Sequence, residues 1–281
     1  MTTDQLEKYG GSLIQHGPAN DRVYLMKLDQ ADLPAILNHL DGLANRHNYS
    51  KIFVKVPASA EPQFLKAGYT TEAKVPGLYQ AREDGLFMAR YPHPDRLIDH
   101  AADQVTQVLA TAMQKAGEKP DFSLPTGAEC RLATTQDLPQ MAELYARVFA
   151  SYPFPIDQAD YLRQTMAENI LYGGVWTADK LLALASAEMD PDNGNAEMTD
   201  FATDPEARGQ GLANALLQLL ERKMPDYGIQ TCYTIARATS FGMNITFAKN
   251  GYHFGGTLIK NTQISGGLES MNVWYKSVAG H

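Results

Sequence analysis

The sequence predicts an α/β or α+β protein, because segments with a strand pattern alternate with segments with a helix pattern along the whole chain. Hydrophobic residues make up 44% of the 281 positions and charged residues 20%. This composition is typical of a globular protein and excludes a wholly disordered one. The length corresponds to one large domain or to two domains of about 150 residues.

The first 94 residues predict a small unit of strands and helices. Leucine and isoleucine recur at helical spacing from Leu33 to Leu43. A second short helix around Phe64 is expected to end at Gly68, because the chain needs a residue there that tolerates a positive φ. Strands are expected at residues 22–28, 51–56, 75–80 and 86–91.

A domain boundary is expected after this unit. Pro92 and Pro94 interrupt the pattern, an apolar helical stripe then runs from Leu97 to Met113, and residues 116–127 are typical of a linker. We therefore expect an N-terminal domain at 1–94, a connecting helix and linker at 95–126, and a second domain at 127–281.

The second domain resumes the alternation of helices and strands. Thr134 and Asp137 have the spacing of a capping box at a helix start. Trp176, Trp274 and Cys232 are expected in the core. We expect helices at 135–150, 210–223 and 242–250, and strands at 129–132, 172–177, 181–189, 196–203, 231–236, 252–260 and 269–276.

An internal repeat links the two domains. FLKAGY at 64–69 is similar to FAKNGY at 247–252, and residues 22–91 repeat the order of elements in residues 196–276. The first copy lacks a glycine-rich turn before its first helix. We interpret this pattern as a duplication, with chance similarity as the alternative.

The glycine-rich turn is the segment most informative about chemistry. Arg208-Gly209-Gln210-Gly211-Leu212-Ala213 follows a strand and opens a helix, so its backbone N–H groups and the helix dipole predict an anion site suited to a pyrophosphate. A dinucleotide fingerprint would require glycine where Asn214 stands, and a P-loop would require Gly-Lys-Ser/Thr. A purely structural tight turn is the remaining alternative.

The pattern R-x-x-G-x-A between a strand and a helix resembles the acetyl-CoA loop of the GCN5-related N-acetyltransferase (GNAT) family. The later Asn244 and the Gly251-Tyr252 pair agree with it. Residues 255–276, with KVPGLYQAREDGLFMARY at 74–91, resemble the β-lysine N6-acetyltransferases of this family over the whole chain. The resemblance implies a GNAT fold whose mixed central sheet is splayed at the acetyl-CoA site, with residues 1–94 as a degenerate GNAT-like half-domain.

This resemblance also implies the reaction and its partners. They are acetyl-CoA as cosubstrate and a small amine, β-lysine, whose N6-acetyl product is an osmolyte. A homodimer is compatible with it. Two alternatives are another small amine or a peptide amine as acceptor, and an acyl-CoA sensor without turnover. The cofactor-binding residues that the resemblance implies are Phe201, Thr203, Arg208, Gly209, Gln210, Gly211, Ala213 and Asn244.

Proton removal from the attacking amine calls for a carboxylate. Glu188, Glu197 and Asp200 lie on strands that border the predicted cleft. Glu197 and Asp200 have opposite parity on an ideal strand, so only a β-bulge lets both face the ligand. The two are equal candidates for the base, and solvated strand-end charges are the alternative for each.

One residue departs from the family pattern. Many members place a tyrosine four residues before the Gly-aromatic pair to protonate the leaving thiolate, and this chain has Phe247 there. The proton then comes from Tyr233, Tyr252 or water, or no general acid is needed.

Recognition of β-lysine requires a cation for its carboxylate and an acid near its β-amine. Arg237 is the candidate for the carboxylate. The candidates for the β-amine lie on the closing hairpin and are Asn261, Ser265, Glu269 and Asn272, all of which could instead serve the hairpin's own structure.

Charge and composition limit the remaining partners. The net charge is −8, and no cluster of Lys and Arg supports binding to nucleic acid. No apolar run approaches the ~18 residues of a membrane helix, and the N-terminal residues lack the features of a secretion signal. Two cysteines and scattered histidines predict neither a disulfide framework nor a metal site. We therefore expect a cytoplasmic protein.

Overall fold

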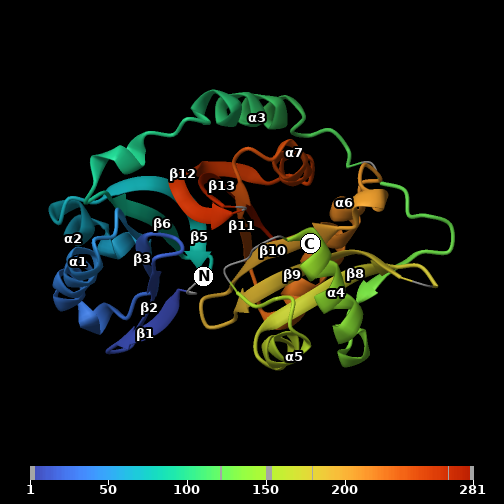
Figure 1. Cartoon of the computed structure of the whole chain (residues 1–281), viewed down its shortest axis with the longest axis horizontal. Coiled ribbons are helices and arrows are strands. Elements are labelled where there is room, and N and C mark those ends of the chain that lie inside the picture. The colour runs from blue at the N-terminus through green and yellow to red at the C-terminus, as the bar shows by residue number, and fades with distance from the viewer. Residues whose placement is uncertain (1–3, 121, 150–153, 179, 265, 279–281) are drawn as a thin grey trace.

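The computed structural model describes residues 4–120, 122–149, 154–178, 180–264 and 266–278. These residues form one mixed sheet of 13 strands, covered by helices (Figure 1). The N-terminal half contains β1 (Gln5–Tyr9), β2 (Ser12–Gly17), β3 (Arg22–Lys27), α1 (Ala35–His47), β4 (Lys51–Pro57), α2 (Glu61–Lys66), β5 (Thr70–Tyr79) and β6 (Glu83–Arg90).

The connection and the C-terminal half follow the predicted alternation. The elements are α3 (Ala102–Gln114), β7 (Glu129–Leu132), α4 (Leu138–Val148), α5 (Ala159–Ala167), β8 (Ile170–Trp176), β9 (Leu181–Asp190), β10 (Asn195–Thr203), α6 (Leu212–Lys223), β11 (Thr231–Arg237), α7 (Phe241–Lys249), β12 (His253–Ile264) and β13 (Gly267–Ser277).

The two halves share one topology. The sheet order is β1-β2-β3-β4-β6-β5-β12-β13-β11-β10-β9-β8-β7. Read outward from the central β5 and β12, the two halves have the same order of strands, with β7 as an additional edge strand in the C-terminal half. Strand β3 runs parallel to β4 as β10 runs parallel to β11, and antiparallel β6 and β13 follow in each half. The predicted repeat is therefore confirmed, and it extends to β1 and β2, which the sequence did not reveal.

The two halves meet along a short seam. Among the described residues, one antiparallel residue pair, Gly256 with Ala73, joins β12 to β5. A Cβ at Gly256 would lie 2.1 Å from the carbonyl oxygen of Glu72, and its φ is +145°, so only glycine permits this approach. A core cluster shared by both halves lines the inner face of the seam and includes Phe53, Phe87, Tyr233 and Val273.

The connecting segment also holds the halves together. Buried Arg96 donates hydrogen bonds to the carbonyl oxygens of Asn20 and Lys260, which lie on opposite sides of the seam. Helix α3 packs on α7 (Figure 1). The predicted stripe from Leu97 to Met113 is wrong at both ends, because Leu97 and Met113 are exposed, and only Val108 and Ala112 of α3 are buried. Helix α3 begins only at Ala102, after Asp99 has accepted a hydrogen bond from the Ala101 N–H.

Local predictions in the C-terminal half are confirmed. The capping box of Thr134 and Asp137 is present, and Trp176, Trp274 and Cys232 are buried. Helix α5 was not anticipated. None of the helices in the described ranges combines the length and apolarity that a membrane crossing needs.

Candidate active site

Strands β10 and β11 diverge in the middle of the C-terminal half. Their parallel pairing ends at Glu197 and Tyr233, although β10 continues to Thr203. A β-bulge interrupts β10 between Thr199 and Ala202, where Asp200 has a φ of +55°. Glu197 and Asp200 could face the same side of β10 only if a β-bulge interrupted the strand, and this bulge is present.

The bulge gathers three carboxylates near the point of divergence. Glu188 on β9 is the cross-strand partner of Glu197, and Asp200 accepts a hydrogen bond of 2.7 Å from the Ser186 hydroxyl. The charge of Asp200 acts on both glutamates. The structure thus brings together all three carboxylates that were candidates for the general base in the sequence analysis.

The surroundings of Glu197 raise the pKa of its carboxyl group toward neutral pH. Burial, together with the negative charge of Glu188, raises the pKa of Glu197 from 4.5 to about 7, although the Lys55 ammonium and the Tyr233 hydroxyl draw it down. The side chain of Glu188 is exposed at the surface, but many protein atoms surround it. The resulting loss of hydration also raises the pKa of Glu188. A carboxylate with a pKa near 7 suits proton abstraction at neutral pH, because both of its protonation states are populated.

A lysine from the N-terminal half reaches this cluster. The Lys55 ammonium on β4 donates a hydrogen bond of 3.1 Å to the Tyr233 hydroxyl, which in turn donates to Glu197. Burial raises the pKa of Tyr233 well above 10. Sequence reasoning missed Lys55, because it lies 178 residues from Tyr233 along the chain.

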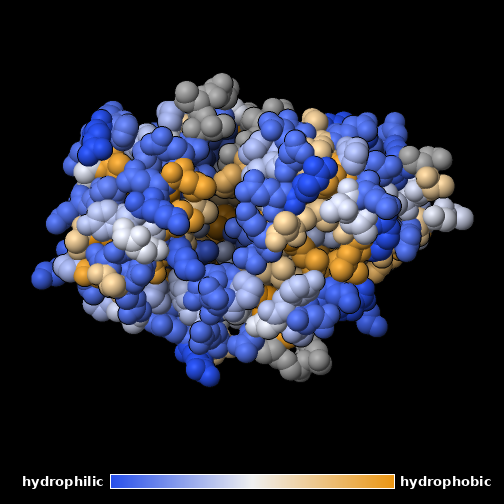
Figure 2. All heavy atoms as spheres, turned by 90° about the horizontal axis from the view of Figure 1, so that it is seen from below, coloured by the Kyte–Doolittle hydropathy of each residue, from blue (hydrophilic) through white to orange (hydrophobic). Residues whose placement is uncertain are grey.

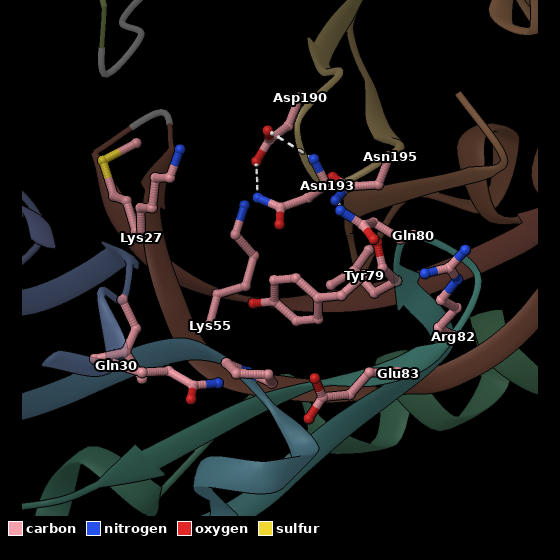
Figure 3. A pocket seen from close by; sticks show the side chains of 14 residues that line it. Lys27, Gln30, Lys55, Tyr79, Gln80, Arg82, Glu83, Asp190, Asn193 and Asn195 are labelled. Atoms are coloured by element: carbon pink, nitrogen blue, oxygen red, sulfur yellow. Dashed lines mark hydrogen bonds between the residues drawn. The ribbon is translucent and has the colours of Figure 1, made fainter. Parts of the chain in front are cut away.

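A cavity of about 390 Å³ adjoins this chain of hydrogen bonds between the two halves. Lys55 and Tyr79 contribute from the N-terminal half, and Asp190 at the end of β9, Asn193 in the following turn and Asn195 at the start of β10 contribute from the C-terminal half (Figure 3). Figure 2 shows a hollow where the two halves meet, with hydrophobic atoms deep inside it. This volume falls within the range of small-molecule sites.

The glycine-rich turn fits the predicted anion site. Gly209 and Gly211 have φ values of +82° and +72°, and a Cβ at Gly209 would point into open space. No side chain among the described residues caps α6, whose N-terminus follows Gly211. The exposed positions here are Arg208, Gly209 and Gln210, with Ala213 half-buried. Backbone donors at this helix start therefore suit a pyrophosphate.

Phe201 and Thr203 lie on β10 beyond the divergence and are half-buried. The Phe201 ring makes an edge contact with Phe247, at 5.7 Å between centroids, and fully buried Phe247 makes another with Tyr252 at 5.0 Å. Tyr252 therefore belongs to the core, whereas Tyr233 lies at the carboxylates.

Two of the asparagines predicted to contact ligands, Asn244 and Asn272, have side-chain partners inside the protein, whereas the side-chain oxygen of buried Asn261 has none among the described residues. Fully buried Asn244 donates to the carbonyl oxygens of Arg237 and Ser240 and accepts from Asn272 and Trp274. Asn272 is also fully buried and accepts from Thr257. With no exposed surface, these side chains do not face solvent, and their contacts favour the structural alternative.

The other predicted substrate residues lie away from the cavity. Arg237 forms a bidentate pair with Glu269, at 2.9 and 2.6 Å, and this pair neutralises both charges. Asn261 is buried, with its carbonyl oxygen accepting from Arg22, and Ser265 lies outside the described residues. None of the described candidates on the hairpin lines the cavity.

Comparison with known proteins defines the class. Residues 138–252 match the acetyltransferase (GNAT) family, and relatives match nearly the whole chain, so the chain belongs to the GNAT family and is an N-acetyltransferase. Members of this family use acetyl-CoA. Within the described part of the chain, no group of three or more His, Cys, Asp or Glu residues could hold a metal ion.

Individual proteins show how far the similarity extends along the chain. The β-lysine N(6)-acetyltransferase of Methanococcus maripaludis is 37% identical and covers 97% of this chain and 98% of its own length. That of Methanosarcina mazei is 31% identical over 85% of this chain and 95% of its own. The ribosomal-protein-S18-alanine N-acetyltransferase of Escherichia coli shares 19% identity over 55% of this chain and 96% of its own, with a TM-score of 0.47.

Proposed function

We propose that this acetyltransferase moves the acetyl group of acetyl-CoA to the terminal (N6) amine of β-lysine, giving N6-acetyl-β-lysine. The observation that carries this proposal is the similarity, over 97% and 85% of the chain, to two proteins named for that activity. The carboxylate cluster beside the divergent strands supports it, because a diamino acid brings two ammonium groups into the site.

The first chemical task in this proposal is to neutralise the attacking amine. A lysine-type ammonium has a pKa of about 10.4, so the neutral form costs roughly 4.6 kcal/mol at pH 7. Glu197 accepts this proton, directly or through water, and its pKa of about 7 supports that role. Asp200 is the second candidate, and Glu188 acts through its charge on Glu197.

Acyl transfer then proceeds at the divergence of the strands. The amine nitrogen bonds to the thioester carbon, the oxygen gains negative charge and accepts from the Phe201 N–H, and the carbon–sulfur bond breaks. The thiolate leaves, and the new amide nitrogen gives its extra proton to water. The thiolate takes up a proton from Tyr233 or from water, because Phe247 has no acidic group. The cosubstrate is held by the turn at 208–213, with the backbone of Phe201 and Thr203.

The organisation of the chain is also part of the proposal. Residues 127–281 form the catalytic domain, residues 95–126 connect it, and residues 1–94 form a degenerate GNAT-like half. No glycine-rich turn precedes α1, which begins after Pro34, and this supports a first half without acetyl-CoA binding. The proposed setting is the cytoplasm, with the product as an osmolyte and the chain as a homodimer. Analytical ultracentrifugation tests the last point.

Steady-state kinetics test the reaction. Thiol release from acetyl-CoA is measured with β-lysine, lysine, ornithine and spermidine as acceptors. The proposal expects the highest kcat/KM for β-lysine and a product acetylated at N6 by NMR. A tenfold preference for another amine refutes the substrate. Absence of thiol release with every amine, despite acetyl-CoA binding, would indicate a sensor.

A further inference from the structure

An amino-acid substrate brings a carboxylate into the site, and that carboxylate needs a cation. The residue expected from the sequence, Arg237, is already neutralised by Glu269. Lys55 differs, because the Tyr233 hydroxyl is the one hydrogen-bond partner that the described residues give its ammonium group. An ammonium group has three donors, so two remain for a ligand.

Lys55 is better placed than the other cations of the cavity wall. Lys27 and Arg82 also line the cavity, but both are exposed, so water competes for their charge. Lys55 is half-buried and extends from β4 toward Asp190 and Asn193 on the opposite wall of the cavity (Figure 3). An ion pair at a partly desolvated cation is stronger and more selective than one at the surface.

The order of groups along β10 gives the substrate a direction. Phe201 lies beyond the point where β10 and β11 part, Glu197 at that point, and Asn195 on the cavity wall. Successive residues on one face of a strand are about 7 Å apart. The cavity is therefore on the side of Glu197 that faces away from the predicted thioester position, where the rest of the acceptor molecule must extend.

The spacing also suits a short diamino acid. The Lys55 ammonium lies 3.1 Å from the Tyr233 hydroxyl, and Tyr233 is in turn a hydrogen-bond partner of Glu197, so one small molecule can reach both the ammonium and the carboxylate. In β-lysine, six bonds separate the terminal amine from the carboxyl carbon, about 7 Å when extended. With one hydrogen bond at each end, such a chain spans the two groups.

We propose that Lys55, supplied by the N-terminal half, binds the substrate carboxylate in the cavity between the halves and thereby selects amino acids over simple polyamines. The inference rests on the proposed function and deepens it by naming the residue that recognises the carboxylate. It also gives the N-terminal half a direct part in catalysis, because one wall of the substrate site belongs to it.

Two substrates and two variants test this assignment. Pentane-1,4-diamine is β-lysine without its carboxylate, so it retains both amines in the same relation. Lys55→Met is expected to lower kcat/KM for β-lysine, mainly through KM, about 30- to 100-fold more than it lowers kcat/KM for pentane-1,4-diamine, whose own loss reports the effect of Lys55 on Tyr233 and Glu197. Lys55→Arg keeps the charge and is expected to retain most of the selectivity.

Controls separate recognition from damage to the fold. Lys74→Met removes an exposed lysine of the same half and is expected to leave both substrates unaffected. Calorimetry with CoA and urea unfolding check that Lys55→Met binds the cosubstrate and folds normally. An equal loss with both substrates would mean that Lys55 acts only through Tyr233 and Glu197, and this overturns the inference alone. No acetylation of β-lysine by the unaltered enzyme overturns the proposed function and the inference with it.

Discussion

Replacement of Glu197 by Gln is expected to stabilise the fold at alkaline pH while it removes activity. The pKa of Glu197 rises from 4.5 to about 7 on folding, because burial and the charge of Glu188 disfavour its ionised form. The folded state therefore binds the proton more tightly than the unfolded state. The free energy of unfolding falls as the pH rises from about 4.5 to 7, and the full cost applies above that window.

The magnitude follows from the size of this shift. At 1.36 kcal/mol per pKa unit, ionised Glu197 costs about 3 kcal/mol at pH 8.5 and under about 1 kcal/mol at pH 5. Glutamine is neutral at both values and still accepts the hydrogen bond from Tyr233. Glu197→Gln is therefore expected to raise the free energy of unfolding by about 2–3 kcal/mol at pH 8.5, and to lower kcat by about 10²- to 10⁴-fold.

Urea unfolding followed by circular dichroism at the two pH values measures the first effect, and thiol release measures the second. Glu129→Gln is the matched control, because that side chain is 72% exposed, and its unfolding free energy should change by less than about 0.5 kcal/mol. A variant that is equally stabilised at both pH values, or destabilised at pH 8.5, would contradict the reasoning. Full activity in Glu197→Gln would move the role of base to Asp200.

Three further predictions concern the neighbouring charge, the cosubstrate turn and the seam. Glu188→Gln removes a like charge beside Glu197, so the acidic limb of the profile of kcat/KM against pH should move down by up to about one unit. Gly211→Val places a branched side chain at a φ of +72°, so calorimetry should detect at least about tenfold weaker CoA binding and urea unfolding a loss of about 1–2 kcal/mol. Lys51→Met leaves buried Glu72 without its ammonium partner, so urea unfolding should report a loss of about 3 kcal/mol.

Local chemistry was readable from the sequence. The turn at 208–213 was predicted because glycines at a strand-to-helix junction depend on a few adjacent residues, and the same applies to the capping box at Thr134. The bulge near Asp200 was predicted as the condition for both Glu197 and Asp200 to face the ligand, because two carboxylates three residues apart cannot share one face of a regular strand. The repeat was visible because similar residues recur after similar strands.

Contacts between segments that are far apart in the chain could not be predicted from the sequence. Lys55 reaches Tyr233 only because β5 and β12 join the halves into one sheet, and the pattern around Lys55 shows an ordinary strand. The polar residues of the closing hairpin had the right types for a substrate, but Asn272 on this hairpin donates its hydrogen bond to Asn244 of α7 inside the protein. Residue type alone does not tell an internal amide from one that faces a ligand.

The continuity of the sheet across Gly256 and Ala73 has a consequence for how the enzyme works. Both walls of the cavity belong to one polypeptide, so their meeting is an intramolecular event whose effective concentration does not fall on dilution. The enzyme does not need to recruit a second subunit to complete this cavity. Opening it like a hinge would separate Gly256 from Ala73 and divide the core cluster that both halves share, so small acceptors are expected to enter and leave through the mouth of the cavity.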